Sequence, residues 1–332
     1  MGEPGSISIV IPLYNEQENV SLLYEELKTV LRTIELPYEI IFVDDGSTDS
    51  SFSILKKMAA EDVDIKVIKL RRNFGQSAAL KAGFDTANGS YIVTLDADLQ
   101  NDPADIPALL KAISEKDLDV VCGWRFNRKD SFTKKISSRT SNTLRKVLIK
   151  ESIHDSGCTL RIYKRECVED IELYGEMHRY IPAILSYNGY RVGEIKSNHR
   201  ERKYGKSKYN WRRLFKGFAD LLVITFWSRF SARPMHIFGT FGLLISIVGS
   251  LTLVIMVAER LLLSRSLSDR PLFILAIMSI IVGLQFFAFG IMADISLKTY
   301  YRQNNFKNYR VEKVIGRGIT GRLPEEYEDT DS

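Results

Sequence analysis

Short apolar runs alternate with longer helical segments over the first 123 or so residues of the chain. The apolar runs are typical of buried strands, and the segments between them begin at residues that favour helix caps. Strands that alternate with helices of about ten residues predict a mostly parallel sheet with helices on both faces and right-handed crossovers. The predicted strands are Ile7–Leu13, Glu39–Val43, Ile65–Leu70, Tyr91–Leu95 and Asp119–Cys122, and the predicted helices include Glu18–Arg32, Gln76–Thr86 and Pro107–Lys116.

A different pattern begins at Trp211. Apolar residues recur there at helical spacing with basic residues between them, which predicts an amphipathic helix lying along a membrane surface. Two longer apolar stretches follow, each long enough to cross a bilayer, and the short link between them predicts a helical hairpin. The predicted divisions are an α/β domain at 1–210, an interfacial helix at 211–233, a hairpin at 234–298 with spans at about 235–258 and 271–297, and a tail at 299–332 whose acidic end is expected to be mobile.

Charge and cysteine content narrow the classes of partner. The net charge is +5, and the basic residues cluster late in the chain, which suits an anionic membrane surface or phosphate ligands better than nucleic acid. Basic residues flank both outer ends of the hairpin, although its link carries others. Because a strand begins almost at once, without a secretory signal, we expect the first domain in the cytoplasm of a bacterium and the hairpin in its inner membrane. The 3 cysteines are too few and too unpatterned for a zinc site or a disulfide framework.

Two carboxylates and an amide follow the fourth predicted strand directly. Asp96, Asp98 and Gln100 come after the apolar run Tyr91–Leu95, at the strand end where ligands bind in open α/β sheets. Carboxylate oxygens suit Mg²⁺ or Mn²⁺, which usually takes phosphate oxygens as further ligands. A solvated turn is the alternative, since Asp is common in turns.

Polar turns also follow the first two predicted strands. Residues 12–16 and 44–47 should lie at the same sheet edge as Asp96 and Asp98. Tyr14 could stack on a base there, and Asp44 could accept the imide N–H of uracil. Turn and cap roles explain the same residues, but three acidic turns at one edge favour a nucleotide site. The chain has no Gly-x-Gly-x-x-Gly after its first strand and no P-loop sequence.

These motifs resemble those of a known family. Val10–Glu16, Val43–Asp49 and Leu95–Gln100 are similar to the leading motifs of family-2 glycosyltransferases with the GT-A fold. Arg72–Gln76 is similar to the version in polyisoprenyl-phosphate hexosyltransferases, such as dolichol-phosphate mannose synthases and bactoprenol glucosyltransferases. The resemblance spans about residues 7–209.

The resemblance implies roles for individual residues. It places a nucleoside against Pro12, Tyr14, Glu16 and Asp44, and it places the metal and the diphosphate against Asp96, Asp98 and Gln100, with Asp96 reaching both. It makes Asp96, Asp98 and Asp155 the catalytic set, with Asp155 on the acceptor side. A lipid phosphate is already largely ionised near neutrality, because the second pKa of a monoester is about 6. Asp155 is therefore interpreted as a base, as a group that orients the acceptor, or as a support for the metal site.

Two basic segments supply candidate phosphate and acceptor contacts. The segment 124–149 has apolar residues at helical spacing and could lie on an anionic membrane, and the segment 200–209 could close over a diphosphate as a lid. A solvated helix and a basic juxtamembrane loop are the respective alternatives. Arg grips phosphate oxygens in a bidentate fork, and Lys supplies a point charge. The candidates are Arg128, Ser138, Arg139, Asn142, Arg200, Arg202 and Lys208.

Together these features predict an inverting, metal-dependent transferase. It would move one hexose from a nucleotide sugar, with UDP-glucose favoured by the resemblance, to undecaprenyl phosphate or a similar polyprenyl phosphate. The absence of Gln-x-x-Arg-Trp favours a single transfer over polymerisation. The expected partners are the donor, the lipid acceptor, membrane lipids and further copies of the chain. The alternatives are a GDP-mannose:dolichol-phosphate transferase, an aminoarabinose-type transferase and a non-catalytic membrane scaffold; a channel is disfavoured because two spans offer few polar pore-lining groups.

Overall fold

The computed structural model describes residues 3–126, 153–155, 157–169, 171–173, 175, 177–200, 234–263, 271–302 and 308–316. Contacts divide the chain into two compact units, one made of residues 1–222 and 307–332 and the other of residues 223–306. Each unit is described by itself.

The first unit is built on one sheet, which has eight strands in the described part of the chain, in the order β7-β5-β6-β4-β1-β2-β3-β8. Neighbouring pairs β1–β2, β1–β4, β2–β3 and β5–β7 are parallel. Strand β6 runs antiparallel between β4 and β5, and β8 runs antiparallel beside β3. The strands are β1 (Glu3–Leu13), β2 (Tyr38–Asp44), β3 (Ile65–Leu70), β4 (Gly89–Thr94), β5 (Val120–Arg125), β6 (Arg161–Lys164), β7 (Val192–Ser197) and β8 (Val311–Ile315).

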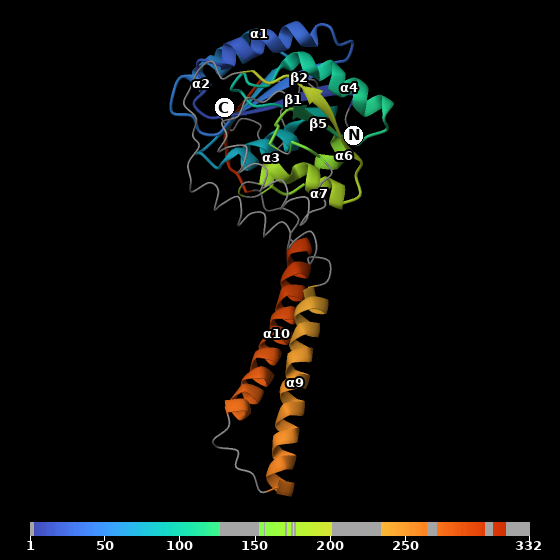
Figure 1. Cartoon of the computed structure of the whole chain (residues 1–332). Helices are drawn as coiled ribbons and strands as arrows, with labels where there is room; N and C mark the ends of the chain where they lie inside the picture. Colours follow the sequence, from blue (N-terminus) through green and yellow to red (C-terminus); the bar gives the residue numbers. More distant parts are fainter. Residues whose placement is uncertain are drawn as a thin grey trace. The chain divides into compact units, whose positions relative to one another are not determined.

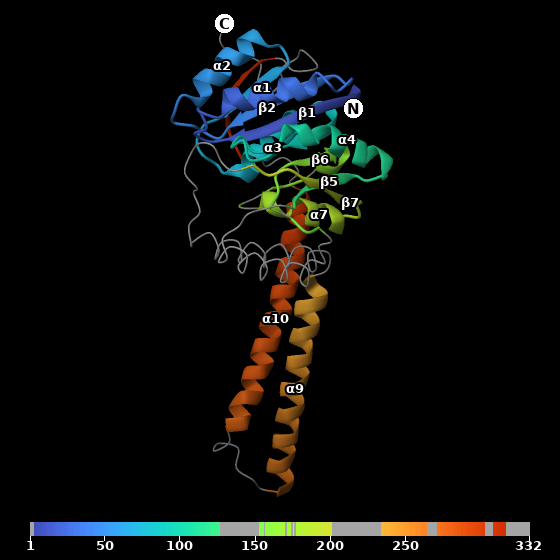
Figure 2. The same cartoon turned by 45° about the horizontal axis from the view of Figure 1, so that its top comes forward.

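Helices cover both faces of this sheet, as Figures 1 and 2 show. On one face α1, α2 and α4 pack their apolar residues against alternate strand residues such as Ile9 and Phe42. On the other face α3, α6 and α7 pack against the intervening residues of the same strands, such as Val10 and Ile41. The helices are α1 (Val20–Leu31), α2 (Ser51–Glu61), α3 (Gln76–Thr86), α4 (Ile106–Glu115), α6 (Arg165–Val168) and α7 (Ile181–Tyr187), with short 3₁₀ turns η1 (Pro103–Asp105) and η2 (Met177–Tyr180).

The predicted layering is confirmed, because helices bury both faces of the parallel core and most of the residues of its strands are apolar. The bounds of β3 and α3 agree with the sequence prediction residue for residue. The antiparallel strands β6 and β8 and the outer strand β7 were not predicted. Each is short, and each mixes charged with apolar residues, so that the apolar run that marks a buried strand is missing.

Strand β8 corrects the description of residues 299–332 as a tail. It lies beyond the long apolar helices in the sequence and yet completes the sheet beside β3. The Arg71 N–H donates to the carbonyl of Arg310 over 3.0 Å, and the buried Tyr309 hydroxyl donates to Asp85 over 2.7 Å. Gly316 ends the strand at φ +86°, where an added Cβ would lie 2.0 Å from the Ile65 carbonyl oxygen. The strand is therefore fixed at both of its ends.

The second unit consists of helices α9 (Pro234–Leu263) and α10 (Pro271–Arg302), packed against each other. Their segments Phe238–Leu263 and Pro271–Ala293 are long and apolar enough to cross a membrane. Helix α9 continues about five residues beyond the predicted span, which shortens the link. The interfacial helix predicted at 211–233 lies outside the described residues.

Small residues allow the two helices to approach closely. A Cβ added to Gly283 would lie 2.5 Å from the Gly242 carbonyl oxygen, and the Ser246 hydroxyl donates to the Ile280 carbonyl over 3.3 Å. This is the type of contact that favours association of helices in lipid, where water provides no hydrophobic driving force. Large apolar side chains elsewhere on both helices are exposed, as a lipid-facing surface requires.

Candidate active site

The turns that follow β1, β2 and β4 lie at one edge of the sheet, because these three strands are parallel. The first two turns are tied together. The Asn15 N–H donates to the Ser47 hydroxyl over 2.9 Å, and the Thr48 N–H donates to the Asn15 side-chain oxygen over 2.8 Å. Asn15 has a φ of 56°, in the left-handed region that Asn tolerates better than most residues. The predicted convergence of the three acidic turns is confirmed.

Asp44 ends β2 fully buried in this edge. One of its oxygens accepts the Ser47 N–H over 2.9 Å, whereas Oδ2 is buried and has no hydrogen-bond partner among the described residues. Burial raises the pKa of this carboxyl, against the lowering effect of Ser47. A buried acceptor without a donor is costly, so this atom fits a ligand that brings an N–H.

Asp45, the next residue, holds the loop that precedes α3. Its carboxylate accepts the N–H groups of Phe74 and Gly75 over 2.7 and 2.9 Å. Burial raises its pKa to about 6. The turn at Gly46 lies so close to Arg72 that an added Cβ would sit 2.5 Å from the Arg72 carbonyl carbon. The loop of residues 71–75 is therefore packed directly against the turn that holds Asp44.

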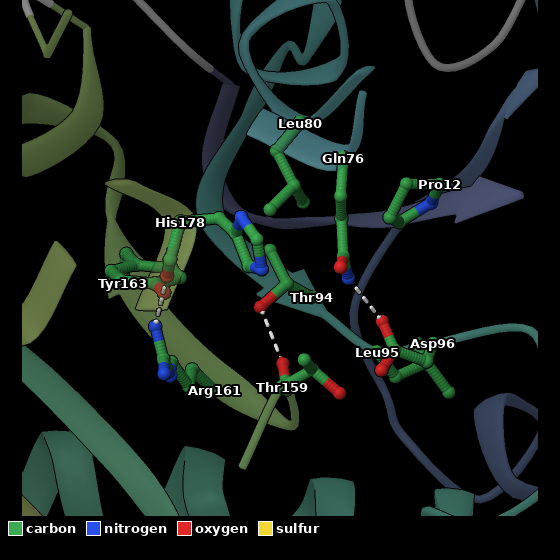
Figure 3. Close-up of a pocket in the computed structure, with 10 residues that line it drawn as sticks. All are labelled: Pro12, Gln76, Leu80, Thr94, Leu95, Asp96, Thr159, Arg161, Tyr163 and His178. Atoms are coloured by element: carbon green, nitrogen blue, oxygen red, sulfur yellow. Dashed lines mark hydrogen bonds between the residues drawn. The ribbon is translucent and has the colours of Figure 1, made fainter. Parts of the chain in front are cut away.

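Asp96 and Asp98 follow β4, and Asp96 lines a pocket with Pro12 and His178 (Figure 3). The Gln76 side chain donates to Asp96 Oδ1 over 2.6 Å. Burial, and then the nearby charge of Asp98, raise the pKa of Asp96 to about 6, which shows that its negative charge is only partly compensated. Beside these carboxylates the buried Leu99 has a φ of 61°, an uncommon value for an apolar residue that indicates a constrained turn.

Asp155 is held by Arg125 at the end of β5. Arg125 donates through Nε and one terminal nitrogen to the two carboxylate oxygens over 2.6 and 2.8 Å, which is a bidentate pair. The Arg125 guanidinium is also close enough to lower the pKa of Asp96, although burial and Asp98 outweigh it. Arg125 thus links Asp155, which the resemblance places on the acceptor side, to the acidic pair after β4.

Comparisons with known proteins identify the family. Residues 8–172 match the family described as Glycosyl transferase family 2. The chain is 37% identical over 313 residues to the dodecaprenyl-phosphate galacturonate synthase of Rhizobium johnstonii, covering 93% of each chain. It is 36% identical over 323 residues to the undecaprenyl-phosphate 4-deoxy-4-formamido-L-arabinose transferase of Photorhabdus laumondii, covering 97% of this chain and 98% of that one.

The protein is a family-2 glycosyltransferase. Its relatives place it among the transferases that act on polyprenyl phosphates. Solved structures show the same GT-A fold. They include the mannosyl-3-phosphoglycerate synthase of Rubrobacter xylanophilus, with a TM-score of 0.52 over 67% of this chain and 74% of that one at 15% identity. They also include the glucosyl-3-phosphoglycerate synthase of Mycobacterium tuberculosis in complex with Mn²⁺, UDP and glucosyl-3-phosphoglycerate, with a TM-score of 0.51 over 68% and 80% at 16% identity.

Two predicted site residues of this transferase are engaged within its own chain. The Arg200 guanidinium pairs with Glu26 and Asp102 at 2.6 and 2.7 Å, and the backbone N–H of Arg200 donates to the Gln100 carbonyl over 2.9 Å. Arg200 therefore braces the Gln100 backbone, and binding a phosphate would require it to exchange partners. Glu16 accepts the Asn19 side-chain amide over 2.6 Å at the start of α1.

The remaining acceptor candidates of the transferase lie outside the described residues: Arg128, Ser138, Arg139, Asn142, Arg202 and Lys208.

The acidic pair of the transferase fits a divalent cation that is shared with a ligand. Among the residues that the structure describes, no group of three or more His, Cys, Asp or Glu side chains is arranged to hold a metal ion. Asp96 and Asp98 alone are an incomplete set, whereas Mg²⁺ and Mn²⁺ are commonly held by one or two carboxylates together with phosphate oxygens. Burial and the charge of Asp98 raise the pKa of Asp96, and a cation held between the two carboxylates would act in the opposite direction.

Sequence reasoning assigned no role in the transferase to Thr159, Arg125 or Gln76. The Thr159 hydroxyl accepts the Asn101 amide over 2.8 Å and also bonds to Asp96, whose pKa it lowers. Thr159 is distant in the sequence from the acidic pair, so only the antiparallel insertion of β6 beside β4 shows the contact. The sequence could have indicated Gln76 as a site residue, because Gln76 is the last residue of the Arg72–Gln76 motif.

Proposed function

We propose that the protein transfers one sugar from a UDP-sugar to a polyprenyl phosphate at the cytoplasmic face of a membrane. The observation that carries this proposal is the edge where the turns of Asp44, Asp96 and Asp98 converge. The unpartnered Asp44 oxygen fits the imide N–H of uracil, and Tyr14, in the turn after β1, would stack on the base. Asp96 and Asp98 would face the diphosphate, with Gln100 beside them.

The chemistry follows from these positions. The lipid phosphate oxygen attacks the anomeric carbon from the face opposite the diphosphate, the bond from that carbon to the diphosphate oxygen breaks, and UDP leaves with inversion. Mg²⁺ or Mn²⁺ on Asp96 and Asp98 would neutralise the departing diphosphate. Asp155 is fixed by Arg125 in a bidentate pair, which supports a role in orienting the acceptor over that of a proton-accepting base. The attacking phosphate is already largely ionised and needs no strong base.

The donor sugar is proposed from the relatives. Their names specify galacturonate and 4-deoxy-4-formamido-L-arabinose, which favours a sugar of this kind over the glucose that the motif resemblance suggested. The two long apolar helices support an integral membrane protein of the bacterial inner membrane, whose interface brings together an apolar acceptor and a water-soluble donor.

The test is sugar transfer by the purified full-length protein in detergent with undecaprenyl phosphate and Mg²⁺ or Mn²⁺. Radiolabelled UDP-galacturonate, UDP-4-deoxy-4-formamido-L-arabinose, UDP-glucose and GDP-mannose would be offered separately, with Asp98→Asn as the inactive control. A lipid product from one UDP-sugar that disappears with EDTA is the expected result. Folded protein that binds UDP and yields no product from any donor would contradict the proposal.

We also propose that copies of the protein associate through their spans. Gln285 lies in the apolar segment of α10 with its side chain exposed, and its amide has no hydrogen-bond partner among the described residues. An unpaired amide is unfavourable in hydrocarbon, and an amide both donates and accepts, so it can pair with its counterpart on a second copy. Crosslinking in lipid vesicles should capture dimers or larger assemblies of the wild type and fewer of Gln285→Leu. Exclusively monomeric wild-type protein would exclude the association.

A further inference from the structure

The motif Arg72–Gln76 of the sequence analysis has no task in the proposed function. The structure places Gln76 at the first position of α3, with its side chain directed into the pocket that Asp96 lines (Figure 3). Its Nε2 donates to Asp96 Oδ1 over 2.6 Å, which is short for a hydrogen bond between an amide and a carboxylate. This contact joins the end of the motif to one of the two acids at the centre of the site.

The backbone on both sides of Gln76 is held in place. Before it, the N–H groups of Phe74 and Gly75 donate to the buried Asp45 carboxylate. After it, the Ser77 hydroxyl lies 3.0 Å from His178 Nδ1 and accepts the His178 N–H over 3.1 Å. With both neighbours tethered, the Gln76 side chain starts from a fixed position and reaches Asp96 with little freedom to lose.

An amide suits this position for an electrostatic reason. Asp96 and Asp98 are neighbouring acids. A cation bound to the diphosphate would be attracted by their negative charges. A Lys at position 76 would cancel part of that charge, and a Glu would add repulsion. A neutral N–H donor fixes one carboxylate oxygen and leaves the charge of the pair unchanged.

We propose that Gln76 is a positioning residue of the transfer reaction. It fixes Asp96 Oδ1, and with the Thr159 hydroxyl, which also bonds to this carboxylate, it holds Asp96 toward the donor diphosphate together with Asp98. Asp45, on the turn that holds Asp44, sets Gln76 through the two N–H groups that precede it. These contacts fix the position of Asp96, at the diphosphate, relative to that of Asp44, at the nucleoside. The inference rests on the proposed function, since it concerns the geometry of the same reaction.

The test compares three variants of the full-length protein in detergent. Gln76→Met keeps nearly the same side-chain volume and removes the donor, and Gln76→Ala removes both. Asn188→Ala is the matched control, because this exposed amide lies between α7 and β7, at the opposite edge of the sheet. The test measures kcat and donor KM, the affinity for UDP without metal by calorimetry, and the melting temperature. It also measures Mn²⁺ binding in the presence of UDP by the loss of the free-ion EPR signal.

Gln76→Met and Gln76→Ala are both expected to lower kcat and the apparent Mn²⁺ affinity by roughly tenfold or more, since a hydrogen bond to a charged group is lost. Metal-free UDP binding and the melting temperature of Gln76→Met should stay close to those of the wild type, and Asn188→Ala should match the wild type throughout. A Gln76→Met protein with wild-type kcat and Mn²⁺ affinity would show that Gln76 only fills space, and would overturn the inference while the proposed function stands. If the wild type transferred no sugar, the proposed function would fail. The Mn²⁺ measurement alone would then test the inference. The same Mn²⁺ affinity in Gln76→Met and the wild type would overturn it.

Discussion

Asp44 has a hydrogen-bond acceptor whose donor would have to come from a ligand. Its Oδ2 is buried and without a hydrogen-bond partner among the described residues, while its other oxygen is used by Ser47. We predict that Asp44→Asn raises the donor KM by roughly ten- to a hundredfold, because the new N–H₂ group would face the uracil N–H as a second donor. The kcat at saturating donor should change far less.

Steady-state kinetics and calorimetry with UDP would measure this effect. Glu61→Gln is a matched control, because it also removes one carboxylate charge, but at the exposed end of α2 on the opposite sheet edge. Equal donor KM values for Asp44→Asn and the wild type would remove Asp44 from the nucleoside site.

Asp96 carries a pH dependence of stability. Its folded-state pKa is about 6, compared with 3.8 for the free side chain. The folded protein therefore binds this proton more tightly than the unfolded chain. The resulting stability is full below about pH 4 and is lost as the pH rises to about 6. Asp96→Asn removes this dependence, so the metal-free variant should be more stable than the wild type by about 1–3 kcal/mol at about pH 7.5.

Thermal unfolding of the metal-free protein would measure this difference. The advantage of Asp96→Asn should shrink as the pH approaches about 4, and transfer activity should be lost at every pH. An advantage that does not change with pH would assign the stabilisation to something other than the ionisation of Asp96.

At the scale of elements, the end of β8 offers a direct test of the strand. Gly316 and Gly189 both have positive φ, at +86° and +94°, but only Gly316 has backbone where a Cβ would lie. We predict that Gly189→Ala costs about 1 kcal/mol from its backbone conformation alone. Gly316→Ala should cost about 1–3 kcal/mol more, because the Ile65 carbonyl must move. Denaturant unfolding of both variants gives the comparison, and equal costs would mean that β8 is not docked there.

The sequence predicted the elements whose pattern is local. Strands β1 to β4 are apolar runs, and their common edge follows from parallel pairing, so the convergence of Asp44, Asp96 and Asp98 could be anticipated. Strands β6, β7 and β8 depend on partners far away in the sequence, as in the pairing of Leu70 with Val311. The site contacts of Arg125 and Gln76 have the same origin: their partners are 30 and 20 residues away, and the chain has to fold before either pair is visible.

At the scale of the whole molecule, the two ends of the apolar hairpin must return to the same unit. Residues before α9 and strand β8 after α10 both belong to the first unit. If α9 and α10 cross the membrane, both ends therefore lie on the side of the transferase domain. The sequence alone indicated this topology less clearly, because the link between the two helices also carries basic residues.

Cysteine labelling tests the topology, and all three native cysteines are buried, so the background should be low. If the transferase domain is cytoplasmic, as proposed, Val63→Cys, at a side chain 76% exposed, and Lys313→Cys on β8 should react with an impermeant maleimide only from the cytoplasmic side. Ser266→Cys, in the link, should react only from the opposite side. Labelling of positions 63 and 313 from different sides would contradict both the topology and the pairing of β8.

Strand β8 also sets an order for the synthesis of the protein. It is the last of the described strands to leave the ribosome, after both apolar helices. Until then β3 presents an open edge of unpaired N–H and C=O groups, the kind of edge that invites pairing between chains. The domain that performs the chemistry thus gains its final strand only once the hairpin has been made. If the hairpin inserts into a membrane as it is made, completion of the sheet therefore follows insertion.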